Sequence, residues 1–411
     1  MAVASRGLPR GCSTICLPIR KELYDRIIDS TLLFRRWLDQ AFHDWPELFP
    51  KAFSQGYTLK DSRLSSKRGL RQRRIRCKAT GAAFSIRPDF VLPYMVAWTD
   101  DAANPLFLRS FGVPFWALAH VFGRNSMYWY RLEVGLGRNS IVGTTVRHGS
   151  VPEHLLADEH HQRRDGVKNY IATTVAAGCC LGAALSQTAG ADDLQVAYGI
   201  FKQEAQNVQA DYAPATANTD GWAATQQAWR ALFPLVVILR CFLHGWLSIR
   251  DRAKHLGEMF WTLGEKVWNA YHAPTRRGFA QRLRRLGEWA GRQVMAHWVL
   301  EQVRKLCGRS QEYGVAYHHP GGHRTSNMLD RVMRAMNRYY EDGQHLHGSK
   351  EACAQHSRAW ALLHNYRPWH PAVARANSGY ASPAERLNQH RYHDNWLHNL
   401  LVSASLAGYR R

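Results

Sequence analysis

The segment Leu155-Leu-Ala-Asp158 begins the part of the chain that decides the fold, because a short apolar run there ends on an acid. Further apolar runs of strand length follow it, and they alternate with segments in which apolar side chains recur at the helical period. The predicted strands are 155–157, 170–177, 180–185, 216–220 and 235–239, and the predicted helices between them are 192–208 and 222–233. Alternating strands and helices predict an α/β domain.

The order of these elements, three strands, helix, strand, helix, strand, is that of a ribonuclease H-like core. From Arg250 to about Gly308 the pattern is helical throughout, which predicts an all-helical insertion. A last core helix is expected near Ser326, followed by a Pro-rich connection and a closing amphipathic segment. Five segments result: a basic N-terminal region (1–100), a helix-turn-helix (101–150), the first part of the core (151–249), the insertion (250–322) and the last part of the core with the tail (323–411).

The charge of the chain points to a polyanionic partner. Lys and Arg number 54 against 32 Asp and Glu, which gives a formal net charge of +22. Such an excess favours nucleic acid binding, while 45% hydrophobic residues leave enough apolar surface for a folded core. No membrane span or secretory signal is expected. Eight cysteines without a CxxC pair fit a reduced compartment, so we expect a cytoplasmic protein.

The N-terminal region combines helix, hairpin and positive charge. After a loose polar start over residues 1–20, a helix is predicted over 21–49 and a hairpin over 75–86 that turns at Thr80-Gly81. Between them lies a basic stretch, 60–78, which would be either a solvated face or a DNA contact; we favour DNA contact. The arginines proposed to contact DNA are Arg71, Arg73, Arg74 and Arg76.

Residues 102–137 are the best candidate for sequence-specific DNA binding. One helix is expected to start over 105–109, a second covers 114–122, and a third covers 127–135 after a turn with Ser126 as its N-cap. This spacing predicts a helix-turn-helix, although a small three-helix packing unit gives the same pattern. The side chains expected to face DNA are Arg124, Asn125, Ser126, Tyr128 and Arg131.

Three widely spaced acids, Asp158, Asp220 and Asp330, are the candidate catalytic residues and metal ligands. Two are expected at strand ends and one on a helix, so the fold could bring them together. Cleavage of a phosphodiester needs charge neutralisation and an activated oxygen, which two divalent ions supply. Mg²⁺ prefers carboxylate oxygens. The alternatives are a strand-end turn at Asp158, an Asp-Gly turn at Asp220, and a solvated helix residue paired with Arg334 at Asp330.

Two further residues, Cys241 and His244, lie three positions apart behind the second acid. Two ligands do not make a zinc site, and no second pair has finger-like spacing. We therefore expect them to pack beside the catalytic strand as support for the active site. Cys179-Cys180, inside an apolar strand, is expected to be core.

At this point the chain resembles a bacterial insertion-sequence transposase of the DDE/D type, and it is similar to the Mutator-like group, whose signature includes a Cys-x2-His after the second acid. The segments that carry the resemblance are Leu156-Ala-Asp158-Glu-His160, Ala217-Asn-Thr-Asp220-Gly-Trp222, Cys241-Phe-Leu-His244 and Arg324-Thr-Ser-Asn-Met-Leu-Asp330. Mutator-like enzymes usually carry Glu as the third acid, whereas this chain has Asp330.

The resemblance implies an enzyme that binds terminal inverted repeats, cuts the element ends, and joins the freed 3′-hydroxyls to target DNA. Its cofactor would be two Mg²⁺ (or Mn²⁺) ions held by Asp158, Asp220 and Asp330. Its partners would be double-stranded DNA, as element ends and target, and further copies of itself in a dimer or larger oligomer. Such an enzyme would work in the bacterial cytoplasm, at the nucleoid. The alternatives are a catalytically silent DNA-binding regulator and a structure-specific nuclease on the same fold.

Overall fold

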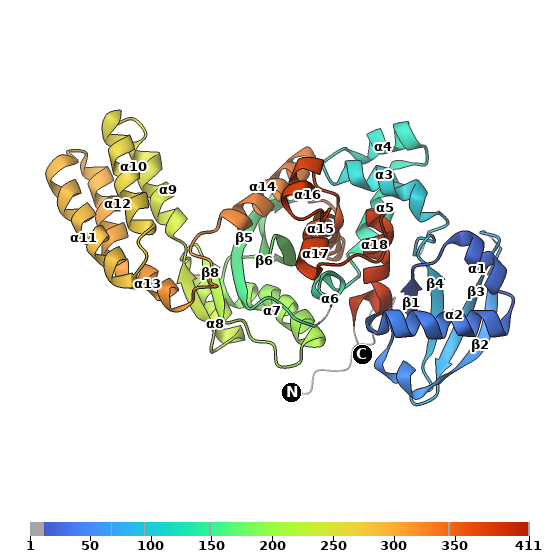
Figure 1. Ribbon diagram of the computed structural model, residues 1–411. Coiled ribbons are helices and arrows are strands. Elements are labelled where there is room, and N and C mark those ends of the chain that lie inside the picture. The colour runs from blue at the N-terminus through green and yellow to red at the C-terminus, as the bar shows by residue number, and fades with distance from the viewer. Residues whose placement is uncertain (1–11, 67, 94, 148, 344–345, 410–411) are drawn as a thin grey trace.

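The computed structural model describes residues 12–66, 68–93, 95–147, 149–343 and 346–409, and shows a mixed α/β chain with two separate sheets (Figure 1). The N-terminal sheet lies at one end of the molecule, a helical bundle at the other, and the second sheet between them (Figure 1). Within the described residues, no helix is both long enough and apolar enough to cross a membrane.

The N-terminal sheet has the strand order β1-β4-β3-β2, and only its β1–β4 pairing is parallel. Its elements are β1 (Thr14–Leu17), α1 (Lys21–Ile27), α2 (Thr31–Asp44), β2 (Tyr57–Ser65), β3 (Leu70–Cys77) and β4 (Ala83–Pro88). The predicted hairpin is confirmed, since β3 and β4 pair antiparallel with Ile75 opposite Phe84.

Two predictions for this region were wrong in part. The start of the chain is not loose throughout, because residues 14–17 pair with a strand some seventy positions later; residues 1–11 lie outside the described part. The predicted helix over 21–49 is divided, because the Ser30 side chain accepts a hydrogen bond from the Leu33 N–H (3.3 Å) and starts a new helix there.

Three consecutive helices follow the first sheet, α3 (Thr99–Arg109), α4 (Phe115–Phe122) and α5 (Ser126–Leu136), and a short α6 (Ile141–Thr145) leads into the second sheet. The predicted N-cap of the third helix was wrong by one position. Asn125, not Ser126, is the cap, because its side chain accepts a hydrogen bond from the Tyr128 N–H at 2.8 Å. Ser126 is the first helical residue instead.

The second sheet has the order β7-β6-β5-β8-β9, in which β5, β6 and β7 are antiparallel and β5, β8 and β9 are parallel. Its strands and helices appear in the predicted order. They are β5 (His154–Arg164), β6 (Val167–Ala176), β7 (Cys179–Ser186), α7 (Ala191–Val208), β8 (Thr216–Thr219), α8 (Ala223–Leu232) and β9 (Val237–Arg240).

The central strand, β5, presents alternate residues to two different layers. Leu155 and Ala157 pack in a core with α7 and α8, whereas Leu156 packs in a core with the later helices α14 (Asn327–Asp342) and α15 (Lys350–Tyr366). The strand is longer than predicted and continues to Arg164. Asp158 therefore lies in the middle of the strand and not at its end, so the expectation of a strand-end acid was wrong.

Helices form a separate bundle between β9 and α14 (Figure 1). They are α9 (Phe242–Ala253), α10 (Glu258–Tyr271), α11 (Arg276–Gln293), α12 (His297–Gly308) and α13 (Ser310–Gly314). Their apolar faces share one core that includes Leu263, Leu283 and Val303. The predicted helical insertion is thus present, and it begins directly after Cys241 rather than at Arg250.

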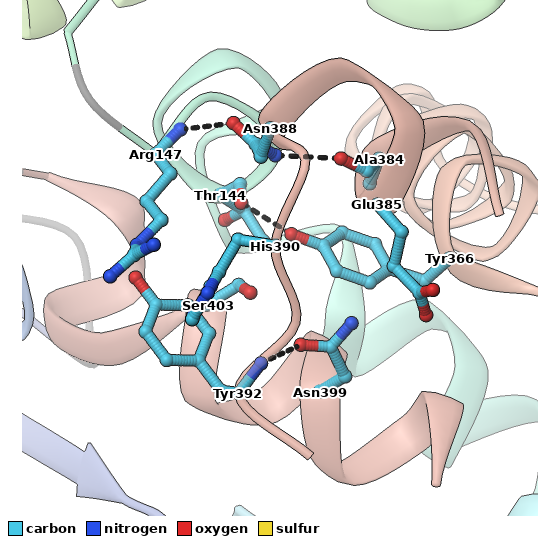
Figure 2. A pocket seen from close by; sticks show the side chains of 10 residues that line it. All are labelled: Thr144, Arg147, Tyr366, Ala384, Glu385, Asn388, His390, Tyr392, Asn399 and Ser403. Atoms are coloured by element: carbon cyan, nitrogen blue, oxygen red, sulfur yellow. Dashed lines mark hydrogen bonds between the residues drawn. The ribbon is translucent and has the colours of Figure 1, made fainter. Parts of the chain in front are cut away.

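The C-terminal helices α16 (Pro371–Ala376), α17 (Pro383–Asn388) and α18 (Trp396–Ser403) return to the middle of the molecule. Figure 2 shows the small polar pocket that α17 and α18 form with α6 and the end of α15. There the Arg147 N–H donates to Asn388 Oδ1 (2.8 Å), and the Tyr366 hydroxyl donates to the Thr144 carbonyl (2.6 Å). Its volume of about 10 Å³ is close to what a single water needs. These residues therefore form a packing contact between the helices.

Candidate active site at the middle of the second sheet

Two of the three predicted acids come together across parallel strands. Leu156 of β5 pairs with Asn218 of the parallel strand β8, and Asp220 directly follows that strand, which ends at Thr219. Burial, together with the negative charges of Asp220 and Glu159, raises the pKa of Asp158 to about 7. The two carboxylates are therefore close enough to repel each other.

Asp220 is held by the tight turn that follows β8. The Trp222 N–H donates to its Oδ1 at 2.7 Å, and Gly221 adopts φ +101°, which favours glycine. A Cβ at Gly221 would also lie 2.6 Å from a guanidinium nitrogen of Arg240. The Asp-Gly turn that was the alternative at Asp220 is therefore present, and it uses one carboxylate oxygen of the aspartate.

His244 faces both of these acids. Cys241 caps α9 and interacts with the His244 imidazole in the first turn of that helix. This interaction, together with the negative charges of Asp158 and Asp220, raises the pKa of His244 to about 9. The expected packed pair beside the acids is observed, and His244 also supplies positive charge to the two carboxylates.

Asp330, the third predicted acid, is connected to this group by successive side-chain hydrogen bonds. The Cys241 thiol donates to Ser326 Oγ (3.3 Å), and the Ser326 hydroxyl donates to Asp330 Oδ2 (3.1 Å). Asp330 is half-buried in the first turn of α14, and no ion pair with Arg334 forms among the described residues. The buried residues of the same helix include Leu329, Val332, Met336 and Tyr340.

The oxygens of Asp158, Asp220 and Asp330 are not all within 4.8 Å of one another. Across the described ranges, the group of three potential ligands that meets this spacing is Asp89, His393 and His398. In that group the His398 Nδ1 hydrogen-bonds Asp89 (2.8 Å) and its Nε2 hydrogen-bonds Asp100 (3.1 Å). Although burial opposes it, bonding to Asp89 raises the pKa of His398. Both ring nitrogens of His398 are thus already engaged, one by Asp89 within the cluster and one by Asp100 outside it.

The sequence did not reveal the neighbours of Asp158 on β5. Glu159 points to the opposite face, as pleat alternation predicts, and accepts hydrogen bonds from Tyr198 (2.7 Å) and Thr225 (2.9 Å). His160 points to the same face as Asp158 and meets Asn337 of α14. These polar residues are buried in a strand, and only their distant partners explain why.

The arginines predicted to contact DNA differ in their exposure and in the contacts that they already make. Arg76 is exposed, and Arg71 is exposed but lies 3.1 Å from Asp29 in an ion pair. The Arg73 Nε donates to the Ile28 carbonyl (2.6 Å), and Arg74 forms an ion pair with Asp61. At the start of α5, Arg124, Asn125 and Arg131 are exposed, whereas Ser126 and Tyr128 are half-buried. The bundle arginines Arg250, Arg252, Arg276, Arg277, Arg284 and Arg285 are exposed as well.

Comparison of the chain with models of known protein families found no match, and no curated protein matches it. The function is therefore argued from the geometry and chemistry of the residues above.

Proposed function

We propose that the chain is a DNA transposase of the DDE/D type, built on a ribonuclease H-like core. The observation that carries the proposal is the half-buried pair Asp158 and Asp220, one on β5 and the other directly after the neighbouring parallel strand β8, linked through His244, Cys241 and Ser326 to Asp330. The strand order of the second sheet, with the first three strands antiparallel and the last two added in parallel, supports the assignment of the core.

The donor set of this site suits a hard divalent cation. Asp158, Asp220 and Asp330 offer only oxygens, which Mg²⁺ and Mn²⁺ prefer. Burial and like-charge repulsion raise the pKa of Asp158, and positive charge placed between the carboxylates relieves that repulsion. When bound, two such ions supply charge neutralisation on the phosphate and activation of the attacking oxygen.

In this proposal the remaining parts of the chain bind and position DNA. The helices α4 and α5 act as a helix-turn-helix, with the exposed Arg124 and Arg131 directed at the duplex. The exposed arginines of the bundle and of β3 contact phosphates and fix the orientation of the strands. Two copies of the chain, or more, hold the two element ends in the bacterial cytoplasm.

The test uses a plasmid that carries the gene with its natural flanking DNA. The purified chain should nick this DNA in the presence of Mg²⁺ and yield joined products. Asp158→Asn, Asp220→Asn and Asp330→Asn should each abolish cutting and leave DNA binding in a gel-shift assay near wild type. A matched control is Asp165→Asn, an exposed turn residue with φ +51° that Asn adopts readily.

Each alternative outcome has a distinct meaning. Unchanged cutting by the three variants at the site would remove these acids from catalysis. Binding without any cutting by the wild-type chain would identify a DNA-binding regulator. Cutting of branched DNA without strand joining would identify a structure-specific nuclease.

A further inference from the structure

A second polar pocket lies between the N-terminal sheet and the C-terminal end of the chain, and it contains none of the residues proposed for catalysis. Its walls come from β1, β3 and β4 on one side and from α18 and the following turn on the other. Thr14, Gln72 and Ser85 line it with polar groups, and Leu401 and Ala404 close it. Its volume of about 200 Å³ far exceeds the roughly 10–15 Å³ that one water requires.

Two arginines line this pocket with incomplete hydrogen bonding. Arg87, on β4, is only 8% exposed, and its buried Nε has no partner among the described residues. The same holds for the buried Nε of Arg68, whose Nη2 donates to the Leu92 carbonyl at 3.1 Å. Neither guanidinium forms an ion pair with a carboxylate in the described ranges.

The two positive charges also oppose each other. Burial and the charge of Arg87 lower the pKa of Arg68. Asp89, which directly follows β4, forms no ion pair with either arginine in the described residues; its Oδ1 accepts from the Ile19 N–H (3.0 Å), and its Oδ2 hydrogen-bonds the His398 Nδ1 (2.8 Å). A buried charge without a partner costs free energy, so an uncompensated pair of them calls for an anion.

We propose that this pocket binds a phosphate group, with Arg87 and Arg68 as its charged ligands and Gln72, Ser85 and Thr14 as hydrogen-bond donors. Two guanidinium groups match the charge of a phosphate dianion, and guanidinium geometry suits phosphate oxygens. The surrounding hydroxyl and amide groups can donate to the remaining oxygens. The phosphate belongs either to a small solute or to a DNA backbone, and bound there it would bridge the N-terminal sheet and α18.

The first experiment measures the thermal unfolding midpoint of the whole chain in inorganic phosphate and in sodium chloride at equal ionic strength. Matching the ionic strength removes the general screening of a chain with net charge +22. Ligand that binds only the folded state raises the midpoint, so saturating phosphate should raise it by a few degrees over chloride. No rise at saturating phosphate would overturn the proposal.

Single substitutions test whether the phosphate-specific rise of the unfolding midpoint comes from this pocket. Arg87→Gln should lose the phosphate-specific rise and, in chloride, should unfold at or above the wild-type temperature because a buried unpaired charge is gone. Arg36→Gln, an exposed change of the same charge on α2, should keep the rise. If Arg87→Gln fails to fold, the half-buried Arg68→Gln replaces it. An equal rise in the wild type and in the pocket variant would also overturn the proposal.

A DNA-binding measurement distinguishes the two possible sources of the phosphate group. If it is a DNA backbone phosphate, Arg87→Gln should weaken duplex binding about tenfold, which corresponds to one such contact of roughly 1.4 kcal/mol, and inorganic phosphate should compete with the duplex beyond matched chloride. If it is a small solute, the duplex affinity of Arg87→Gln should equal that of the wild type, although the wild type shows the phosphate-specific thermal rise and the variant lacks it.

Discussion

The imidazole Nε2 of His160 lies 2.5 Å from the Oδ1 of Asn337, and this contact ties the central strand to the helix that carries the third acid. His160 follows Asp158 by two residues and so shares its face of β5. Asn337 follows Asp330 by seven residues, about two helical turns, and so shares its side of α14. Burial lowers the pKa of His160 to about 4, which keeps the ring neutral with Nε2–H as donor to Asn337.

If this contact sets the position of Asp330, removing its acceptor should impair catalysis more than folding. Asn337→Leu should lower cleavage at least about tenfold and raise the Mg²⁺ concentration needed for half-maximal cutting, with DNA affinity unchanged. The loss of unfolding free energy should be only about 1–3 kcal/mol, that of one hydrogen bond. Asn337→Asp keeps an acceptor oxygen and should behave like wild type. An unaltered Mg²⁺ dependence in Asn337→Leu would show that the contact is merely structural.

The raised pKa of Asp158 predicts a pH dependence of stability. Its pKa in the folded chain is about 7, above the usual 3.8, so the folded state holds a proton that the unfolded chain has released. The resulting stabilisation is complete below about pH 4 and is lost as the pH rises through 7. In chelator, the wild-type unfolding midpoint should therefore fall between pH 5 and 8, and Asp158→Asn should flatten that fall.

Divalent ions should reverse this loss. Saturating Mg²⁺ should raise the wild-type midpoint more at pH 8, where Asp158 is ionised, than at pH 5, because the ion competes with the proton. Asp158→Asn should show little Mg²⁺ effect at either pH. Parallel pH curves for the two proteins in chelator would mean that the carboxyl titrates normally.

The strand β5 illustrates what the sequence could and could not predict. Its apolar start, Leu155-Leu-Ala157, was recognisable because buried strands are rich in such residues. Its second half was missed because Glu159, His160 and Gln162 are polar, and they are buried only through partners on other elements. Local composition carries no information about those partners.

Local composition also failed to predict strand β2 and helix α15. Strand β2 was missed because residues 57–65 form the edge of a sheet and only the first of them is buried, so no apolar alternation marks them. Helix α15 was missed because its buried positions include His356, Ser357 and Asn365, which bond to other elements. The closeness of Asp158 and Asp220 depends on strand register, which the acids themselves do not encode.

The proposed recognition helix predicts a specific loss of DNA binding. Arg131 is exposed on α5, so Arg131→Ala should leave the unfolding midpoint unchanged. Its affinity for the element ends should fall by about 1–3 kcal/mol if it reads a base, with relaxed specificity at that position. If it contacts a phosphate instead, affinity should fall for all sequences and the salt slope should decrease by about 1. Arg36→Ala, exposed on α2, is the control. Footprints identical to wild type would exclude Arg131 from the interface.

The buried pair of Arg109 and Glu133 predicts the largest loss of stability. Arg109 is 2% exposed and Glu133 is fully buried, and the Arg109 Nε lies 2.9 Å from the Glu133 carboxylate. Rings of Phe115 and Tyr339 lie against the guanidinium, each with its centroid 4.3 Å from the Arg109 Cζ. Because Tyr339 belongs to α14 and also donates to Glu133, this network joins α3 and α5 to the helix of Asp330.

Removing one charge of this pair leaves the other buried without a partner. Glu133→Gln should therefore lower the unfolding free energy by about 3–5 kcal/mol, measured by denaturant titration at pH 7. The double variant Arg109→Met with Glu133→Leu removes both charges and should recover most of that loss, and the Tyr339 hydroxyl keeps the His356 Nε2 as a hydrogen-bond partner. The single variants Arg109→Met and Glu133→Leu are measured as well. If their losses of unfolding free energy add up to the loss of the double variant, the two charges do not stabilise each other. Side-chain packing, and not the ion pair, would then hold α14 against α3 and α5.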